Sequence, residues 1–338
     1  MAWFGTGTPA GAGDQMKKIL CLLPMNFLIA GCVGEQSMFS VAGEEAERTL
    51  LLTWILIIGS LTIFAFVIGC VVLAFVGSDR LKGWLRHNRM LIGGGIIFPV
   101  VTLSALLIYG FVALNAGPAG RNEEPDLTIK VVGEQWWWRV TYEGPEGSVV
   151  ETANEIYLPT DRIVRLELTS ADVIHSFWIP AWAGKVDMIP GRTNQLTLHV
   201  TTPRRVRGQC AEYCGGAHAL MSFVAVALPP DEFEAWLEIE ATGAAVISGE
   251  GLEAFLGAGC GGCHAIRGTS ANGLIGPDLT HYGSRKTIAA ATLPNTDENT
   301  LKWLKDHQSL KPDNLMPEFD FLSDAEMEAI ALYLGGLR

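Results

Sequence analysis

The stretch GQCAEYCGGAHALM, residues 208–221, decides the fold of the central part of this chain. A second histidine lies upstream of it in the segment VIHSFW, residues 173–178. The candidate metal-ligating side chains in these two stretches are His175, Cys210, Cys214, His218 and Met221. Thiolate, imidazole and thioether together form a ligand set suited to copper. We therefore expect a copper site built from one loop and one strand end.

The second cysteine distinguishes this pattern from a single-copper site, which needs one Cys, two His and a weak axial Met. Two thiolates that each bridge two copper ions would give a compact binuclear centre that shares one electron, with one histidine on each metal. Met221 and the main-chain carbonyl of Glu212 would fill the remaining positions. Such a centre changes its geometry little when its charge changes, which suits fast electron transfer.

Two other interpretations of these residues stay open. Cys210 and Cys214 could form a disulfide, since the outer face of a membrane is oxidising, but a disulfide does not need a histidine and a methionine at these offsets. Zinc would accept two Cys and two His, but it has no use for a thioether and carries no electrons. His199, on an alternating segment, is expected to be a surface residue.

The segments around the cysteine loop are short, alternating and rich in β-branched residues. Three of them cover residues 127–132, 163–168 and 195–200, with Pro and Gly between successive segments. Alternation with a period of two, bounded by turn residues, is typical of strands. We expect an all-β Greek-key sandwich or barrel over residues 125–235.

Two long uncharged runs, residues 50–76 and 90–116, precede this β domain. Each exceeds the roughly 20 residues that a helix needs to cross about 30 Å of hydrocarbon. The segment between them sets four basic residues against one acidic residue: Arg80, Lys82, Arg86 and Arg89 against Asp79. Because positive charge stays on the cytoplasmic side, we expect a two-helix transmembrane hairpin over residues 45–117, followed by domains on the outer face. A buried soluble hairpin is the alternative.

The first 32 residues have the pattern of an export signal. MKK at residues 16–18 supplies positive charge, and the apolar run at residues 19–29 is too short to span a bilayer comfortably. The ending IAGC, residues 29–32, resembles a bacterial lipobox, which would leave Cys32 as the lipidated N-terminus. An ordinary signal with an incidental cysteine is the alternative.

A second cysteine motif marks a separate C-terminal domain, residues 249–338, which a linker at residues 236–248 joins to the β domain. The order Cys260-Gly-Gly-Cys263-His264 supplies two thiols for the vinyl groups of one haem and an imidazole for its iron. A methionine is expected as the other axial ligand, because a thioether raises the reduction potential relative to a second imidazole. Met316, in the segment KPDNLMP, is the candidate.

Other assignments in this domain are weaker. A thioredoxin-like redox pair would need a βαβ pattern, which the sequence lacks. Met327 falls on the apolar side of a helix that starts at Ser323 with a capping box to Glu326, and is expected in the core. His281 and His307 could compete with the methionine as iron ligands.

Composition narrows the class of partner. The 338 residues carry a formal charge of −12, which argues against nucleic acid and favours cationic proteins drawn in by the long-range field. The mean hydropathy is +0.27, which is high for a purely soluble protein.

The pattern Cys-x-Glu-x-Cys-x3-His-x2-Met, with an upstream His-Ser-Phe-Trp, resembles the CuA motif of cytochrome c oxidase subunit II. Two preceding helices, the segment QWWW at residues 135–138 and MIPGR at residues 188–192 also match the layout of that family, so the resemblance covers most of residues 45–235. It implies a cupredoxin-like β domain that holds binuclear CuA, with these ligands: His175, Cys210, Glu212, Cys214, His218 and Met221. It also implies that Trp136 accepts electrons from a docked cytochrome c, and that the Glu212 carboxylate helps to hold magnesium at the interface with subunit I.

The C-terminal motif, with GPDL at residues 276–279, resembles a small all-α class I cytochrome c, and its fusion to subunit II resembles the caa3-type oxidases. The resemblance implies an oxidoreductase and proton translocase whose electron-receiving subunit passes electrons from cytochrome c or another donor through haem c and CuA to haem in subunit I. Oxygen would be reduced to water in that subunit, and subunit III would be a further partner. The protein would be a multi-pass protein of the bacterial inner membrane, with both outer domains on the periplasmic face.

One departure from the family concerns proton uptake. The start of the second helix, residues 90–95, lacks the glutamate that many members place there, so no such role is carried over. A stand-alone membrane-tethered electron-transfer or copper-handling protein is the alternative function. A quinol oxidase subunit would be expected to lack the copper ligands.

Overall fold

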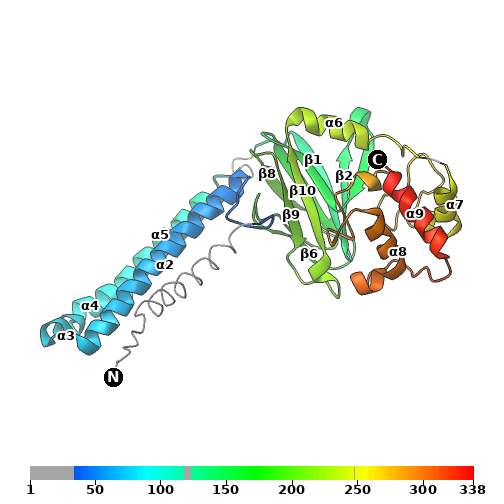
Figure 1. Cartoon of the computed structure of the whole chain (residues 1–338). Helices are drawn as coiled ribbons and strands as arrows, with labels where there is room; N and C mark the ends of the chain where they lie inside the picture. The colour runs from blue at the N-terminus through cyan, green and yellow to red at the C-terminus, as the bar shows by residue number, and fades with distance from the viewer. Residues whose placement is uncertain (1–33, 118–122, 247) are drawn as a thin grey trace, which may run out of the picture.

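The structure, a computed structural model, describes residues 34–117, 123–246 and 248–338. A helical hairpin, a β sandwich and a small helical domain follow one another along the chain, and the helices project from the sandwich away from the C-terminal domain (Figure 1). The expected fold class is therefore confirmed. The expected export signal, with Cys32, lies outside the described residues.

The hairpin is formed by two long helical stretches that a short charged segment connects. Its elements are α2 (Glu44–Val76), α3 (Asp79–Leu85), α4 (Asn88–Ile92), the π-helical turn η1 (Gly93–Ile97) and α5 (Phe98–Leu114). Two stretches, Glu44–Val76 and Asn88–Leu114, are long and apolar enough to cross a membrane, with mean hydropathies of 2.8 and 2.3. None of either apolar window is buried within the protein, whereas a helix of a soluble core would be. These faces suit lipid or other transmembrane helices.

The first helix begins at Glu44, six residues before the apolar run that predicted it. Its first turn is acidic, and negative side chains stabilise the positive end of a helix dipole. Arg48 also pairs with Glu44 and Glu45 along the same face. The charged turn therefore extends the helix beyond its apolar part.

The β domain consists of two five-stranded sheets packed face to face. One sheet has the order β3-β2-β1-β5-β8, with bounds β1 (Leu127–Glu134), β2 (Trp137–Glu143), β3 (Val149–Ala153), β5 (Ile163–Ser170) and β8 (Asn194–His199). The other has the order β4-β10-β9-β6-β7, with bounds β4 (Glu155–Pro159), β6 (His175–Trp178), β7 (Val186–Met188), β9 (Arg204–Cys210) and β10 (Ser222–Leu228). Strict alternation of buried and half-buried residues along β5 shows the sandwich pattern that the sequence predicted.

Aromatic side chains fill the core between the sheets. Trp138 lies edge-on to Phe177 and Phe223, with ring centroids 5.7 and 5.1 Å apart. Helix α6 (Pro230–Glu240) covers the sandwich, and its Trp236 stacks on Tyr157 at 4.3 Å. The expected linker start at residue 236 is therefore wrong: this stacking keeps residues 236–240 helical and in the β domain, and the connecting segment begins at residue 241.

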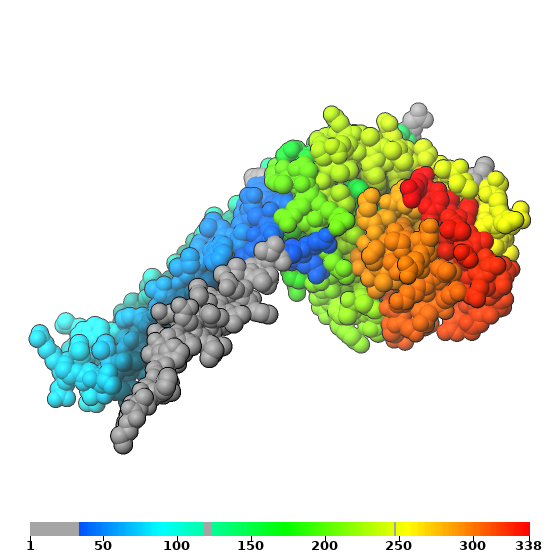
Figure 2. Space-filling model, in the orientation of Figure 1, coloured from blue at the N-terminus to red at the C-terminus, as the bar shows by residue number. Residues whose placement is uncertain are grey.

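The C-terminal domain is a small helical bundle around its own apolar core. Its elements are α7 (Glu250–Gly257), η4 (Cys260–Gly262), η5 (Tyr282–Ser284), β11 (Thr287–Ile288), β12 (Leu293–Pro294), α8 (Asp297–Leu310) and α9 (Asp324–Gly336). The predicted capping box between Ser323 and Glu326 opens α9, and Met327 is buried in the core. Figure 2 shows this domain, in orange and red, seated directly against the sandwich.

The start of α2 is joined to the sandwich by main-chain hydrogen bonds. Ala42 N–H donates to the Ala181 carbonyl at 2.8 Å, and Ala46 N–H donates to the Trp182 carbonyl at 3.2 Å. Gly43 forms a bridge with Val200, and a Cβ placed on it would lie 2.6 Å from the Trp182 oxygen. The junction thus needs a residue without a side chain at position 43.

Replacing this glycine should therefore loosen the junction. We expect Gly43→Ala to lower the free energy of unfolding by about 1–3 kcal/mol, the usual range for overpacking. Thermal unfolding of the full chain in detergent, followed by tryptophan fluorescence, measures the loss. The control is Gly59→Ala within α2, where a Cβ meets nothing within 4 Å. Equal stabilities of the two variants would contradict the prediction.

Candidate metal centre and haem cleft

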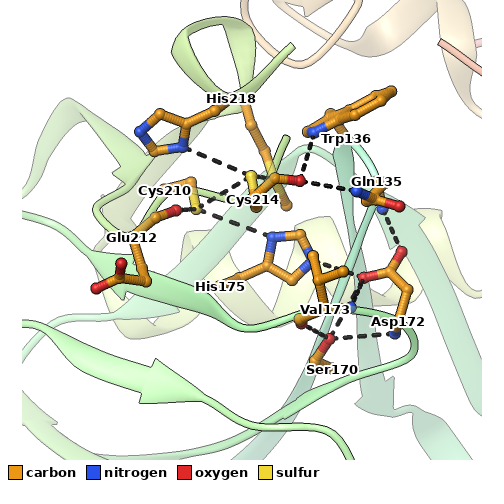
Figure 3. A network of polar contacts seen from close by, with 11 residues as sticks. Gln135, Trp136, Ser170, Asp172, Val173, His175, Cys210, Glu212, Cys214 and His218 are labelled. Carbon is orange, nitrogen blue, oxygen red and sulfur yellow. Dashed lines mark hydrogen bonds and ion pairs between the residues drawn. The ribbon is translucent and has the colours of Figure 1, made fainter. Parts of the chain in front are cut away.

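Strand pairing assembles the sulfur and imidazole side chains at one end of the sandwich. His175 begins β6 and Cys210 ends β9, and these strands are antiparallel neighbours with Phe177 opposite Cys210. Cys214 lies on the loop that follows β9, and Met221 directly precedes β10. One loop and one strand end therefore meet as the sequence predicted (Figure 3).

The two thiols lie at the centre of this group, and each faces one imidazole. Cys210 Sγ is 3.8 Å from Cys214 Sγ, almost twice the length of a disulfide bond (about 2.05 Å). His175 Nδ1 lies 3.9 Å from the first sulfur, and His218 Nδ1 lies 3.5 Å from the second. His175, Cys210 and Cys214 form a buried cluster whose ligand atoms lie within 4.8 Å of one another. Each sulfur therefore has one imidazole nitrogen facing it, and these residues would suit a metal centre that binds both sulfurs.

The two weaker candidate ligands approach different sulfurs. Met221 Sδ is 3.7 Å from Cys214 Sγ, and the carbonyl oxygen of Glu212 is 3.1 Å from Cys210 Sγ. The Glu212 carboxylate is exposed and accepts only from the neighbouring Tyr213 N–H, at 3.3 Å, among the hydrogen bonds of the described residues. The main chain of Glu212 thus faces the cluster while its side chain faces outward. Its role in holding magnesium stays a prediction.

The electrostatics of the two thiols are tightly linked. The hydrogen bond with Cys214 lowers the pKa of Cys210, and the same contact raises the pKa of Cys214. Contact between the sulfurs thus favours loss of the proton from Cys210 and its retention on Cys214. A metal that binds both residues as thiolates would release any proton that they carry.

Asp172 orients the buried histidine of this centre. The ring of His175 is 0% exposed, and its Nε2–H donates to Asp172 Oδ1 at 2.8 Å, which turns Nδ1 toward Cys210. Burial lowers the pKa of His175, but hydrogen bonds with Cys210 and Asp172 outweigh it and raise the pKa overall. Sequence reasoning missed Asp172, although a carboxylate three residues before a ligand histidine was a usable signal.

Trp136 and Gln135 fasten the cysteine loop from the other sheet. Trp136 Nε1–H donates to the Cys214 carbonyl at 3.0 Å, and Gln135 Nε2–H donates to the same oxygen at 2.7 Å (Figure 3). Gly215 follows with φ at +116°, and a Cβ there would lie 2.9 Å from the Trp136 ring. Only glycine fits this turn, so Trp136 stays in direct contact with the cysteine loop.

The C-terminal domain contains a cleft bounded by its predicted haem ligands. Two adjoining cavities, of about 290 and 130 Å³, are both lined by Cys263, His264 and Met316, and Cys260 lines the smaller one. His264 Nδ1–H donates to the Pro277 carbonyl at 2.8 Å, which leaves Nε2 as the acceptor nitrogen.

Space beside His264 and two buried polar atoms in the cleft also suit a haem. Gly276 leaves room beside the imidazole, since a Cβ there would lie 2.6 Å from His264 Cε1. Arg285 Nε and Thr287 Oγ1 are buried, lack a hydrogen-bond partner within the described residues, and belong to side chains that line the larger cavity. Haem propionates would supply acceptors for such donors. These residues therefore fit a haem.

The competing histidines are engaged elsewhere. His307 Nε2 lies 3.0 Å from the Pro317 carbonyl, and its Nδ1 lies 3.0 Å from the Asn314 amide nitrogen. His281 Nε2 lies 3.2 Å from the carbonyl of Thr242 in the connecting segment. Neither histidine lines the two cavities, whereas Met316 lines both.

Comparison with known proteins places these sites in a family. Residues 143–228 match the family described as cytochrome c oxidase subunit II, periplasmic domain, and residues 248–338 match the family described as cytochrome c. Cytochrome c oxidase subunit 2 of Alkalihalophilus pseudofirmus is 34% identical over 337 residues, which cover 94% of this chain and 96% of that protein. The chain belongs to the cytochrome c oxidase subunit 2 family.

A second relative agrees with this membership, and one solved structure is also similar. Cytochrome c oxidase subunit 2 of Bacillus subtilis is 31% identical, with 95% of this chain and 96% of that protein covered. The solved periplasmic domain of subunit II of cytochrome oxidase from Bradyrhizobium japonicum is 34% identical, covers 35% of this chain and 94% of its own, and has a TM-score of 0.33.

Membership in the cytochrome c oxidase subunit 2 family defines the general class of this chain. It is a subunit of cytochrome c oxidase, an oxidoreductase complex, and serves there in electron transfer. The first matched domain implies copper and the second implies haem. With its two apolar helices, the chain is a membrane-anchored protein.

Removing the carboxylate that orients His175 should weaken metal binding. We expect Asp172→Asn to reduce copper affinity by about 10- to 100-fold, because partners of a ligand histidine set its orientation and basicity. Competition titration of the full chain with a copper chelator measures the change. Asp231→Asn, at an exposed position on α6, is the matched control. An Asp172→Asn variant that binds copper as tightly as its control would refute the assigned role.

Proposed function

We propose that this chain is the electron-receiving subunit of a caa3-type cytochrome c oxidase. It relays electrons from cytochrome c or another donor, through a covalent haem c and binuclear CuA, to haem in subunit I. Oxygen is reduced there to water, coupled to proton translocation. One observation carries the proposal: Trp136, His264 and Met316 line one cavity, and Trp136 also donates a hydrogen bond to the main chain of Cys214.

The copper half of the proposal rests on the assembled donor set. The proposed CuA ligands are His175, Cys210, the Glu212 carbonyl, Cys214, His218 and Met221. Two sulfurs at the centre, each facing one imidazole, suit two copper ions better than a single zinc ion, and the nearby thioether favours copper. Copper would supply reversible one-electron chemistry at this place.

The haem half rests on the cleft of the C-terminal domain. Cys260 and Cys263 are proposed to attach the haem, and His264 and Met316 to ligate its iron. The haem would supply a second one-electron centre, while the Pro277 carbonyl orients the proximal imidazole and apolar side chains surround the cleft.

Trp136 is proposed as the first acceptor of electrons within the β domain. Its side chain is only 7% exposed and borders the haem cleft, so its closest electron source is the haem domain of its own chain. A soluble donor would then reach the copper centre through that domain. The negative charge of the chain supports a cationic donor.

Several finer assignments belong to the same proposal. We assign residues 45–117 to a hairpin that crosses the bacterial inner membrane twice, and place residues 125–240 and 249–338 on the periplasmic face. Subunit III is proposed as a further partner, and Glu212 as a carboxylate of a magnesium site at the subunit I interface. Cys32 is proposed as a lipidated N-terminus.

Metal and haem analysis of the complete chain, purified with its partner subunits, tests the proposal. We expect two coppers that share one unpaired electron in the EPR spectrum, and one covalent haem. The variant Cys214→Ser should lose the shared-electron signal and keep the haem. Saturation by one metal ion per chain, or purification of an active chain without a large haem-containing subunit, would refute the oxidase assignment. The second result would favour a stand-alone electron carrier.

The methionine ligand has its own test. We expect Met316→Leu to keep the covalent haem but to lower its reduction potential, because the thioether ligand raises that potential. A redox titration followed by haem absorbance measures the shift. Met327→Leu, a volume-conserving change in the core of the same domain, should leave the potential unchanged. An unchanged potential in Met316→Leu would rule out this residue as the ligand.

A further inference from the structure

Two buried charged side chains, one from each domain, fasten the haem domain to the sandwich. Lys311, which is 3% exposed, donates from Nζ to the Trp136 carbonyl at 2.5 Å and to the Ala289 carbonyl at 3.3 Å. Glu155, which is 2% exposed, accepts from the main-chain N–H groups of Lys286 at 2.5 Å and Thr287 at 3.3 Å. Each domain thus holds the main chain of the other.

Burying a charged side chain costs free energy unless hydrogen bonds compensate for the lost contact with water. Burial lowers the pKa of Lys311 to about 7 and raises the pKa of Glu155, so both charged forms are disfavoured by desolvation. An apolar pair would close the interface with less desolvation, but hydrogen bonds to defined main-chain atoms fix one relative position of the two domains. The lysine contact is insensitive to titration, because ammonium and amine both have at least two N–H donors for the two carbonyls.

The lysine contact lies between the two sites of the proposed relay. Its acceptor is the main chain of Trp136, whose indole holds the Cys214 carbonyl. On the haem side, the Lys311 carbonyl accepts from the Asn314 amide at 2.8 Å, and the Asn314 side-chain oxygen accepts from Met316 N–H at 3.1 Å. A continuous series of hydrogen bonds therefore connects the loop of the iron ligand with the loop of the copper ligand.

A strained turn of the haem domain docks beside the lysine. Ala289, Ala290 and Ala291 all have positive φ values, between 55° and 59°. Residues other than glycine rarely adopt this backbone conformation. The Ala290 carbonyl accepts from Ser222 N–H at 3.3 Å, and Ser222 directly follows the ligand Met221. Such backbone conformations persist where surrounding contacts hold them. The interface supplies two such contacts, from Lys311 and from Ser222.

We propose that Lys311 is a positioning residue that fixes the haem cleft against Trp136 and so sets the rate of electron transfer from haem to copper within one chain. Glu155 fastens the same interface at a second point. The inference rests on the proposed relay function. It means that the haem domain is permanently docked and does not swing between a donor and the sandwich.

The test uses Lys311→Met in the complete oxidase, since methionine resembles lysine in length but has no donor. After rapid photoreduction of the haem, we expect electron transfer to copper to slow by roughly tenfold or more, as expected for a small displacement of reacting groups. The haem potential, copper content and copper EPR should stay as in the unaltered protein. Lys302→Met, at an exposed position on α8, is the matched control and should transfer electrons at the unaltered rate.

A second measurement does not depend on the bound groups. Hydrogen exchange of the main chain at residues 133–138 and 286–292 should be faster in Lys311→Met than in the control, because both segments lose a contact across the interface. Glu155→Leu, at the second fastener, should speed exchange at residues 286–292 and slow electron transfer in the same way. This variant keeps the test available if Lys311→Met does not assemble.

The outcomes separate this inference from the function on which it rests. If the unaltered protein lacks either copper or haem, the relay function itself fails. If it contains both and Lys311→Met transfers electrons at the unaltered rate, the positioning role is wrong. A slower rate together with a shifted haem potential or lost copper would also overturn it, because Lys311 would then act on a redox site directly.

Discussion

The structure depends on the antiparallel pairing of β6 with β9. This pairing brings His175, which begins one strand, against Cys210, which ends the other, across 35 positions of sequence. Every other donor of the cluster is local to Cys210, within one loop that Trp136 and Gln135 secure from the opposite sheet. The β sandwich therefore acts as a rigid frame for a sulfur pair that the loop alone could not hold in place.

Local sequence patterns predicted most features that depend on residues close together in the chain. Three patterns depend only on residues a few positions apart: the spacing of the cysteine loop, the haem attachment motif and the alternation of β5. They could therefore be recognised before the three-dimensional structure was known. Asp172 escaped notice, and Gln135 was noticed only as part of the segment QWWW, because their contacts depend on which strands pair and on how two sheets face each other. The helical extension to Glu240 escaped for the same reason, since Trp236 is held by Tyr157 in a distant strand.

The boundary between the β domain and the C-terminal domain was the least predictable part. Composition indicated a linker, and a linker suggests independent units. Lys311 and Glu155 look like ordinary charged surface residues in sequence, and only the folded chain buries each of them against the other domain. A fused chain of this kind thus places its second redox domain by specific contacts, and the short connecting segment serves chiefly to keep the partners together.

The β-bridge between Gly43 and Val200 limits the possible membrane topology of the chain. Main-chain hydrogen bonds cannot form through a hydrocarbon layer, so the segment before α2 and the sandwich after α5 must occupy the same aqueous compartment. The number of crossings between them is therefore even, whatever the distribution of basic residues. The bridge also joins positions far apart in the sequence, so Gly43 can pair with Val200 only after the strands of the sandwich have been synthesised.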